Sequence, residues 1–428
     1  MKPRLLIADK NKKIFDVPGL TAVGSKTGTL SPLDDKALIK LPYGSELFTL
    51  PDRYPVGYCE TARKFITLTQ NPCKKKPEAC YAVAAFISPG YTACYSTAYI
   101  ESKGAKLLPL FSYSAVCLYR GEFYVPAVRV DRERRQDLRL MNIQKIQQNV
   151  KRFRKLFGKN RLFKHLIRCA LTYHCPAGKN FFLQRYECPL PTSTACNSRC
   201  IGCISFQSGK ECPITQPRIS FTPTPREIAE IALFHIRNVR RPVVSFGQGC
   251  EGEPLMAGGV LFEAISLIRK ETKKGTINLN TNASKPKLVE KLVKSGLDSI
   301  RVSVNSLRPR YYNRYYKPIG YGFADVLKSI ELTKKAGGFV SINYLTMPGF
   351  TDDSGETKAL MDFLKRFDID MIQWRNLNYD PLSYAKQMGI RPAIKDMVGI
   401  AELIEMVKKR FPRVMHGYFN PPREKWLR

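Results

Sequence analysis

The 428-residue chain has few acidic side chains and histidines, and it has no long apolar run. No run reaches the length of about 20 residues that a helix needs to cross a bilayer, so no membrane partner is expected. The amino-terminal run MKPRLLIADKNKKIF is apolar only briefly before lysines follow, which is not the pattern of a secretory signal. Thirteen cysteines without an export signal predict a cytoplasmic protein whose thiols serve metals or chemistry.

The sequence also has few histidines and lacks the common nucleotide-binding motifs. Only four histidines occur, and no two of them form a metal-binding pair at helical spacing. His235 lies in a predicted amphipathic helix and is expected to be structural. No G-x-G-x-x-G run follows a predicted strand and no P-loop is present, which argues against the corresponding dinucleotide and nucleotide sites. No internal repeat is visible.

Lysine and arginine outnumber the acidic residues by 70 to 36, giving a formal net charge of +34. Such a charge favours a polyanionic partner, above all an RNA such as tRNA or rRNA. The alternative is a general basic bias that keeps the chain soluble and identifies no partner. Residues 151–168 carry eight basic side chains and no acidic one, with apolar residues near helical spacing. This predicts a basic amphipathic helix that packs on the protein, with RNA contact as a second role.

Three cysteines fall within eight residues, in the run CNSRCIGC: Cys196, Cys200 and Cys203. A 4Fe–4S cluster normally takes four thiolates, so three ligands from one loop leave one iron free to bind a small molecule. Zinc sites usually add a second cysteine pair or histidines, which this loop lacks. Disulfide pairing does not explain these three cysteines, because their number is odd and because disulfides are rare in the expected cytoplasmic compartment. The spacing therefore favours an iron–sulfur cluster at which chemistry is done.

The C-x3-C-x2-C pattern is similar to the signature of the radical S-adenosylmethionine (SAM) superfamily. The resemblance implies that the three cysteines hold a 4Fe–4S cluster whose open iron binds the amino and carboxylate groups of SAM. It also implies reductive cleavage of SAM to a 5′-deoxyadenosyl radical, followed by hydrogen abstraction from a substrate. A flavodoxin- or ferredoxin-like protein is then the expected electron donor.

Strand and helix patterns alternate beyond the cysteine loop. They begin with a predicted strand over 181–188 and end with a predicted helix over 393–411, which makes six βα units. Regular alternation requires a parallel sheet with right-handed crossovers, either an open doubly wound sheet or an incomplete barrel. The resemblance implies the second, an α/β fold with a partial (βα)6 TIM-like barrel. In such barrels the chemistry lies at the carboxyl ends of the strands.

The run GQGCEGEP (247–254) follows the second predicted strand of this barrel. It resembles the family's Gly-Gly-Glu-Pro element, which lies against the amino group of SAM. Gly252, Glu253 and Pro254 match the end of that element, whereas Glu251 stands where the family has Gly. Polar residues end later strands, and an arginine inside a barrel needs a ligand or an acidic partner. The resemblance thus implies SAM contacts at Gly249, Glu251, Gly252, Glu253, Pro254, Asn280, Ser303, Asn305 and Arg375.

The spacing of the remaining cysteines indicates a metal site less specifically than that of the three clustered cysteines. Many radical SAM enzymes hold auxiliary clusters, and the resemblance implies that an auxiliary iron–sulfur cluster here would draw on five cysteines near the loop: Cys169, Cys175, Cys188, Cys212 and Cys250. Cys250 adjoins the predicted SAM site, so cluster contact and simple packing are both open for it. Four cysteines of the amino-terminal half match no known site.

Short apolar runs broken by Gly and Pro turns predict a mostly β amino-terminal half, which would cover the barrel mouth and protect the radical. The expected organisation has four parts: an accessory domain of mostly β structure (1–135), a basic helical linker region (136–180), the radical SAM partial barrel (181–411) and a carboxy-terminal tail (412–428). Membership of a superfamily does not fix the substrate. The substrate is therefore unknown, and three roles stay open: RNA modification, peptide or protein modification, and a non-catalytic iron–sulfur or RNA-binding role. No catalytic residue is assigned.

Overall fold

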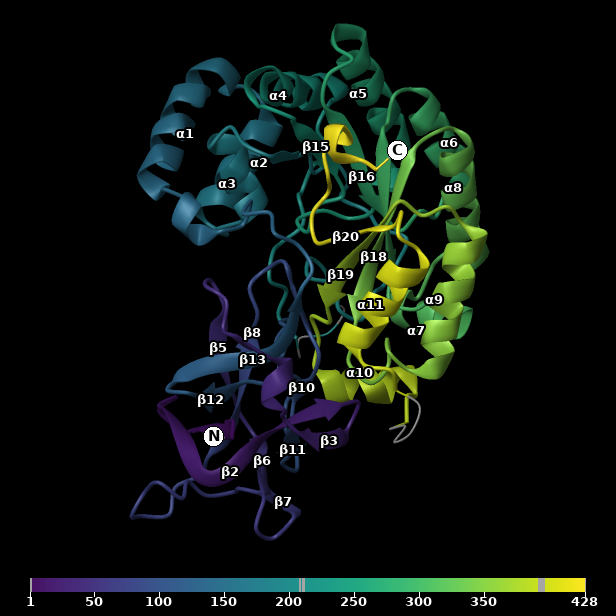
Figure 1. Cartoon of the computed structure of the whole chain (residues 1–428). Coiled ribbons are helices and arrows are strands. Elements are labelled where there is room, and N and C mark those ends of the chain that lie inside the picture. Colours follow the sequence, from purple (N-terminus) through teal and green to yellow (C-terminus); the bar gives the residue numbers. More distant parts are fainter. Residues whose placement is uncertain (1, 208, 210–211, 392–396, 428) are drawn as a thin grey trace.

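The computed structural model describes residues 2–207, 209, 212–391 and 397–427. Its strands form two sheets, an antiparallel one in the amino-terminal part and a curled parallel one in the carboxy-terminal part (Figure 1). This confirms the expected α/β fold with a partial barrel and a mostly β accessory part. None of the helices in the described ranges has the length and apolar character needed to span a membrane.

The amino-terminal sheet is built from short strands joined by tight turns, and its neighbours pair antiparallel. Its thirteen strands in the described residues are β1 (Arg4–Ala8), β2 (Ile14–Lys26), β3 (Thr29–Pro32), β4 (Leu38–Lys40), β5 (Glu46–Leu50), β6 (Arg53–Cys59), β7 (Lys64–Thr67), β8 (Tyr81–Phe86), β9 (Tyr91–Ala93), β10 (Ser96–Thr97), β11 (Tyr99–Glu101), β12 (Cys117–Tyr119) and β13 (Glu122–Arg129). Three helices follow it: α1 (Ile143–Phe157), α2 (Arg161–Leu171) and α3 (Pro176–Phe182).

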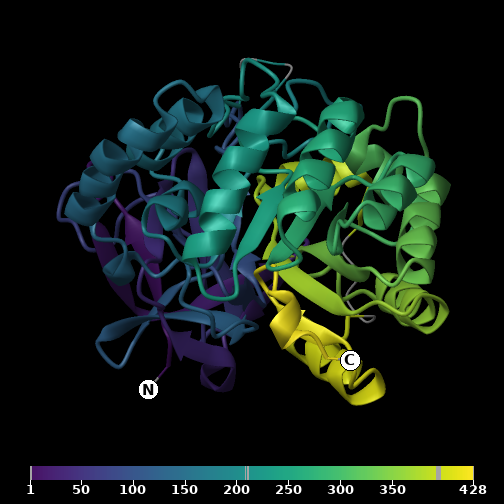
Figure 2. The same cartoon turned by 90° about the horizontal axis from the view of Figure 1, so that it is seen from above.

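The carboxy-terminal sheet has seven strands, each hydrogen-bonded in parallel to the next along the chain. They are β14 (Glu187–Pro189), β15 (Val243–Phe246), β16 (Thr276–Thr281), β17 (Ser299–Val304), β18 (Phe339–Thr346), β19 (Met371–Asn376) and β20 (Met415–Gly417). The connecting helices are α4 (Pro225–Asn238), α5 (Gly258–Glu271), α6 (Pro286–Lys294), α7 (Pro309–Tyr316), α8 (Phe323–Lys335), α9 (Ser354–Arg366), α10 (Pro381–Met388) and α11 (Ile400–Arg410). Figure 2 shows several of these helices along the outer side of the curved sheet.

Local sequence explains these elements. The barrel strands β15 and β16 are buried along their whole length, as expected for a parallel sheet covered on both faces. Helix α4 begins at a capping box, in which Thr224 and Glu227 satisfy each other's backbone N–H groups, with Pro225 in the first turn. The apolar faces of α1 to α4 and of the barrel helices join one continuous core.

Two predicted elements differ from the structure in the linker region. The predicted helix over 151–168 is two helices, because the Asn160 side chain accepts the Phe163 N–H and starts α2 afresh. Its expected packing is confirmed, since Phe153, Phe163 and Leu166 are fully buried. The predicted first strand over 181–188 is wrong at its start: α3 ends at Phe182, and β14 covers only Glu187–Pro189.

The other differences lie at the carboxy-terminal end. The expected tail contains β20, a seventh strand of three residues that pairs with β19. The predicted helix over 393–411 is observed as α11 (Ile400–Arg410), and positions 393–396 of that prediction lie outside the described residues. Helices α7 and α10, each of eight residues, were not predicted.

The amino-terminal sheet docks where the last barrel strands end. Asn376, the last residue of β19, accepts the Ala93 N–H at 2.8 Å and donates to the Tyr91 carbonyl at 2.9 Å. Thr27 donates to the Pro348 carbonyl, just beyond β18, at 3.1 Å. The sheet therefore contacts the carboxyl edge of the barrel, which is the edge where barrel chemistry is expected.

A buried ion pair spans this contact. The Arg53 guanidinium lies 2.9 Å from the Asp380 carboxylate, and the two side chains are 2% and 1% exposed. Tyr99 also donates a hydrogen bond to Asp380. Because removing one partner leaves a charge buried and unpaired, we expect Arg53→Met to lower the free energy of unfolding by about 3–5 kcal/mol, measured by urea denaturation.

Two comparisons identify the ion pair as the cause. The double variant Arg53→Met with Asp380→Asn should regain part of that loss, because no charge then remains unpaired. Lys106→Met, at an exposed position of the loop between β11 and β12, should stay within about 0.5 kcal/mol of the parent chain. A loss that is equally large in all three variants would contradict this explanation.

His235 makes the fold sensitive to acid. Burial lowers the pKa of His235 to about 4, and its ring nitrogen lies 3.2 Å from the Tyr186 carbonyl oxygen. As pH falls from about 6.5 to about 4, the unfolded chain binds a proton that the folded chain does not, which costs up to ~3 kcal/mol of stability. We expect urea denaturation of His235→Gln to show a shallower loss of stability across that window than the parent chain. Parallel curves would rule out His235 as the titrating group.

Candidate functional site

The three clustered cysteines lie in the loop that follows β14, at the carboxyl edge of the barrel. Cys196, Cys200 and Cys203 line one cavity there. Burial raises the pKa of the Cys200 thiol far above its usual range, and the nearby Cys203 and Cys196 thiols raise it further. Negatively charged thiolates gathered in one cavity repel one another, and a positive partner stabilises them. A metal ion or the irons of a cluster supply such charge, so the donor set fits a 4Fe–4S cluster.

The loop after β15 forms a second wall of the cavity, and Glu251 holds that loop in shape. Its carboxylate accepts four backbone N–H groups: Thr192 at 2.7 Å, Ser193 at 2.9 Å, and Gly247 and Gln248 at 2.7 Å each. Burial raises the pKa of Glu251 to about 7, whereas these four donors favour its charged form. Glu251 therefore joins the segment before the cysteine loop to the turn after β15.

Glu253 links the same loop to the end of β16. Its carboxylate accepts the Asn282 N–H at 2.8 Å and the Leu255 N–H at 3.1 Å, and the Thr281 hydroxyl also donates to it. Burial raises the pKa of Glu253 to about 7. The side chain lines the cavity with the cysteines, and burial raises the pKa of Cys196, with the Glu253 charge raising it further. An acidic group beside the cavity can accept hydrogen bonds from an amine.

Glycine is required at two positions of this wall because the backbones nearly touch. Gly247 has φ of +77°, and a Cβ there would lie 1.8 Å from the Asn280 carbonyl oxygen. A Cβ on Gly252 would lie 2.0 Å from the Ala195 carbonyl oxygen, immediately before Cys196. These contacts bring the cysteine loop and the turn after β15 together, which explains glycine at both positions.

Six of the nine residues predicted to bind SAM line the cavity with the cysteines: Glu251, Gly252, Glu253, Pro254, Asn280 and Ser303. The other three lie outside its lining in the described structure. The Gly249 backbone packs near Ile204, and Asn305 is buried and donates to the Tyr384 hydroxyl at 3.1 Å. Arg375 donates to the Tyr418 carbonyl at 2.6 Å and stacks on that ring at 3.7 Å. Which of the nine contact SAM stays a prediction.

Two arginines that the sequence did not single out also line the cavity. Arg301 projects from β17 beside Ser303, and its Nε is buried without a hydrogen-bond partner among the described residues. Burial lowers its pKa to about 9, so the guanidinium remains charged at neutral pH. Arg218 lies 3.9 Å from the Cys203 sulfur. The period-two alternation of Arg301 and Ser303 along one strand was the signal that could have found the first.

Comparison with known proteins agrees with this geometry. The model of the Radical SAM superfamily matches residues 190–361, which include the cysteine loop, the turn after β15 and Arg301. Two curated relatives are molybdenum cofactor biosynthesis protein 1 of Bos taurus, 24% identical over 221 residues, and that of Homo sapiens, 26% identical over 221 residues. Each alignment covers 51% of this chain and 31% of the relative, so the chain matches only about a third of their length.

Solved structures also resemble the chain, at low identity. Native anSMEcpe with bound AdoMet shares 19% identity, with a TM-score of 0.35 over 45% of this chain and 52% of that chain. Methylornithine synthase shares 16% identity, with a TM-score of 0.38 over 63% of this chain and 77% of that chain. The family match covers residues 190–361, about 40% of the chain, and it identifies this segment as similar to the radical SAM superfamily, whose members are enzymes.

Proposed function

We propose that this chain binds a 4Fe–4S cluster through Cys196, Cys200 and Cys203 and cleaves SAM reductively to a 5′-deoxyadenosyl radical, which abstracts hydrogen from a substrate. The observation that carries the proposal is one cavity lined by these three thiols, by Glu253 and by the backbone of the turn after β15. When bound, the cluster supplies the electron and the open iron that this chemistry needs.

The residues around the cavity suit the charges of SAM. Glu253 supplies an acceptor for its amino group, and the tight approach of Gly252 leaves backbone, not side chain, facing the cavity. Arg301, on β17, supplies a positive charge in the same cavity lining, suited to a carboxylate or phosphate of a reactant. Its buried Nε, which has no hydrogen-bond partner in the part of the chain that the structure describes, supports this role, because a buried donor without a partner costs free energy until an acceptor arrives.

The docked amino-terminal sheet supports a radical mechanism in a second way. It contacts the ends of β18 and β19 through Thr27 and Ala93. A radical must be kept from water and oxygen, so we propose that the sheet helps to close the barrel mouth. The Arg53–Asp380 ion pair would hold it there.

The test is anaerobic reconstitution of the full chain with iron and sulfide, reduction with dithionite, and chromatographic measurement of 5′-deoxyadenosine formed from SAM. The proposal predicts product that depends on reductant, iron and SAM together. A fully assembled cluster that binds SAM but gives no product, with or without candidate substrates, would favour a non-catalytic iron–sulfur role instead.

RNA is the substrate class that a specific observation favours. Eight basic side chains on α1, α2 and the turn between them are all exposed, and they are Lys151, Arg152, Arg154, Lys155, Lys159, Arg161, Lys164 and Arg168. Their helices use the opposite face for packing, and apart from Arg161, which pairs with Glu227, the basic side chains are placed to meet phosphates. No such observation favours a peptide or protein substrate.

Filter binding of unmodified tRNA tests this assignment. A site that contacts six or more phosphates should lose at least about 1000-fold in affinity between 50 and 200 mM salt. Replacing Lys151, Arg154 and Lys155 by Gln should weaken binding, whereas the same change at the exposed Lys408 and Lys409 of α11 should not. If the two sets of substitutions weakened tRNA binding equally, the binding would be explained by non-specific charge alone, and the RNA assignment would fail.

A further inference from the structure

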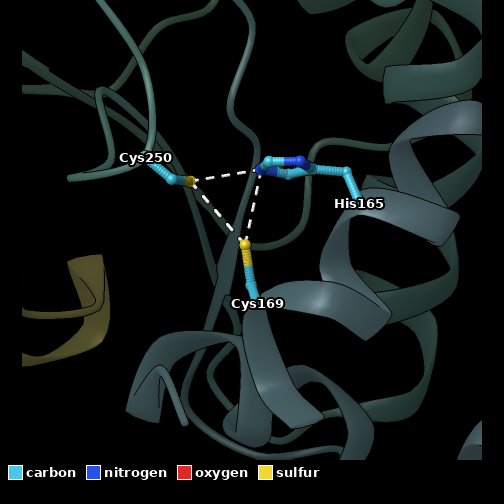
Figure 3. Close-up of side chains that lie close together, drawn as sticks. All are labelled: His165, Cys169 and Cys250. Atoms are coloured by element: carbon cyan, nitrogen blue, oxygen red, sulfur yellow. Dashed lines mark hydrogen bonds between the residues drawn. The ribbon is translucent and has the colours of Figure 1, made fainter. Parts of the chain in front are cut away.

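A second group of metal-ligating side chains lies apart from the cavity. His165 and Cys169 stand one helical turn apart on α2, and Cys250 comes from the turn after β15 (Figure 3). The His165 Nε2 lies 3.4 Å from the Cys250 sulfur and 3.4 Å from the Cys169 sulfur. The two sulfurs are 3.9 Å apart, and both thiols are buried. The three side chains point toward one another from two separate segments of the chain.

These distances are those of ligands around a single tetrahedral ion. With zinc–sulfur bonds of about 2.3 Å and zinc–nitrogen bonds of about 2.05 Å, tetrahedral geometry places two sulfurs about 3.8 Å apart and a sulfur and a nitrogen about 3.6 Å apart. The observed separations, 3.9 Å for the sulfur pair and 3.4 Å for each sulfur–nitrogen pair, agree within about 0.2 Å. The three donors are thus already arranged for one ion.

The same distances argue against a cuboidal cluster at this place. In a 4Fe–4S cluster each thiolate binds a different iron, so the sulfurs stand farther apart than two thiolates on one ion. The other cysteines considered for an auxiliary cluster do not complete a set. Cys188 donates to the Pro189 carbonyl and Cys212 to the Leu108 carbonyl, each away from this group. Cys175 lies closer, since its backbone N–H donates to the Cys169 carbonyl at 2.9 Å.

We propose that His165, Cys169 and Cys250 bind one Zn²⁺ ion. Two thiolates and one imidazole form a donor set that zinc, a borderline-soft ion, prefers over Mg²⁺ or Ca²⁺. Spacing of four residues on α2 presents His165 and Cys169 on the same helix face, as two ligands of one ion require. The Gln216 side-chain amide nitrogen donates to the Cys169 sulfur at 3.5 Å.

The ion would join the linker helices to the barrel. Cys250 lies in the turn between Gly247 and Pro254, next to Glu251, and its carbonyl accepts the Ile219 N–H at 2.7 Å. Metal ligation at Cys250 therefore fixes α2 against the loop that forms one wall of the cavity. This consequence for SAM binding rests on the proposed function, whereas the metal site itself does not.

Zinc content of the full chain tests the site independently of the iron cluster. The chain is purified anaerobically from zinc-supplemented cells, and zinc, iron and protein are quantified by mass spectrometry. We expect about one zinc per chain, both in the parent and in the variant with Cys196, Cys200 and Cys203 all replaced by Ala. The triple variant loses iron, so failure of the proposed cluster and failure of the zinc site are distinguishable.

Ligand variants identify the residues. His165→Ala and Cys250→Ser should each lower zinc to less than about a fifth of the parent value, because two remaining ligands hold the ion poorly. Cys73→Ser, an exposed cysteine of the amino-terminal part, is the matched control and should keep the parent zinc content. Retention of zinc by both ligand variants would overturn the proposal.

Cobalt substitution tests the zinc site even if the His165→Ala or Cys250→Ser variant does not fold. Co²⁺ added to the zinc-depleted triple-alanine variant should give the visible bands of a tetrahedral ion and the near-ultraviolet bands of thiolate ligation. Three other outcomes would overturn the assignment: no zinc together with no cobalt bands, iron in place of zinc at one per chain in the triple variant, or a Cys169–Cys250 disulfide found by mass spectrometry.

Discussion

Replacing Cys200 by Ala should abolish the formation of 5′-deoxyadenosine from SAM, with a loss of at least about 1000-fold relative to the reconstituted parent chain. Cys200 lies between Cys196 and Cys203 in one loop, and all three line the same cavity. Two thiolates cannot hold a 4Fe–4S cluster that already lacks a fourth cysteine in this loop. Iron content and the electron paramagnetic resonance signal of the reduced protein should fall with the product.

The control for this variant is Cys117→Ala. Cys117 is fully buried in β12 of the amino-terminal sheet and is not among the residues that line the cavity, so its replacement removes a buried thiol without changing the cavity lining. We expect that variant to keep its iron and its turnover while losing about 1–2 kcal/mol of stability. Turnover that survives in Cys200→Ala, or that disappears equally in Cys117→Ala, would contradict the assignment of the cluster ligands.

The parallel half of the fold was predictable because its signals are local. Strands β15 and β16 are buried along their whole length, and they lie between helices whose apolar residues recur at helical spacing. The start of the barrel was misplaced because the apolar residues at the start of FFLQRYEC end α3, and only the last two residues of that segment belong to β14. β20 is too short to give a pattern, and it exists through its pairing with β19.

The site residues, like the elements of the fold, could be predicted from the sequence where the signal is local and not where it depends on packing. The cysteine loop and the turn after β15 are contiguous motifs, so their residues could be named from the sequence, and six predicted residues line one cavity with the three cysteines. Arg301 alternates with Ser299 and Ser303 along β17, and the barrel places it in the lining of the same cavity as the cysteines. The His165–Cys169–Cys250 group joins positions 81 residues apart, a proximity that only the packing of α2 on the barrel creates.

Glu251→Gln should both destabilise the fold and weaken SAM binding, because the Glu251 carboxylate is the common acceptor for four backbone N–H groups. One oxygen accepts from Thr192 and Ser193, and the other accepts from Gly247 and Gln248. An amide keeps one of these oxygens and places an NH₂ donor at the other, so two backbone donors face a donor in either orientation. We expect a loss of about 3–5 kcal/mol, seen as a fall in Tm on the order of 10 °C.

The same substitution should raise the Kd for SAM at least ~10-fold in calorimetric titration of the reconstituted protein, because Gly252 and Glu253 are placed by this turn. Glu263→Gln, at an exposed position of α5, is the matched control and should change Tm and Kd little. If the variant bound SAM as tightly as the parent while melting early, Glu251 would stabilise the fold without setting the shape of the cavity. An unchanged Tm would show that the four backbone donors find other partners. It would contradict the role of Glu251 in positioning the turn after β15.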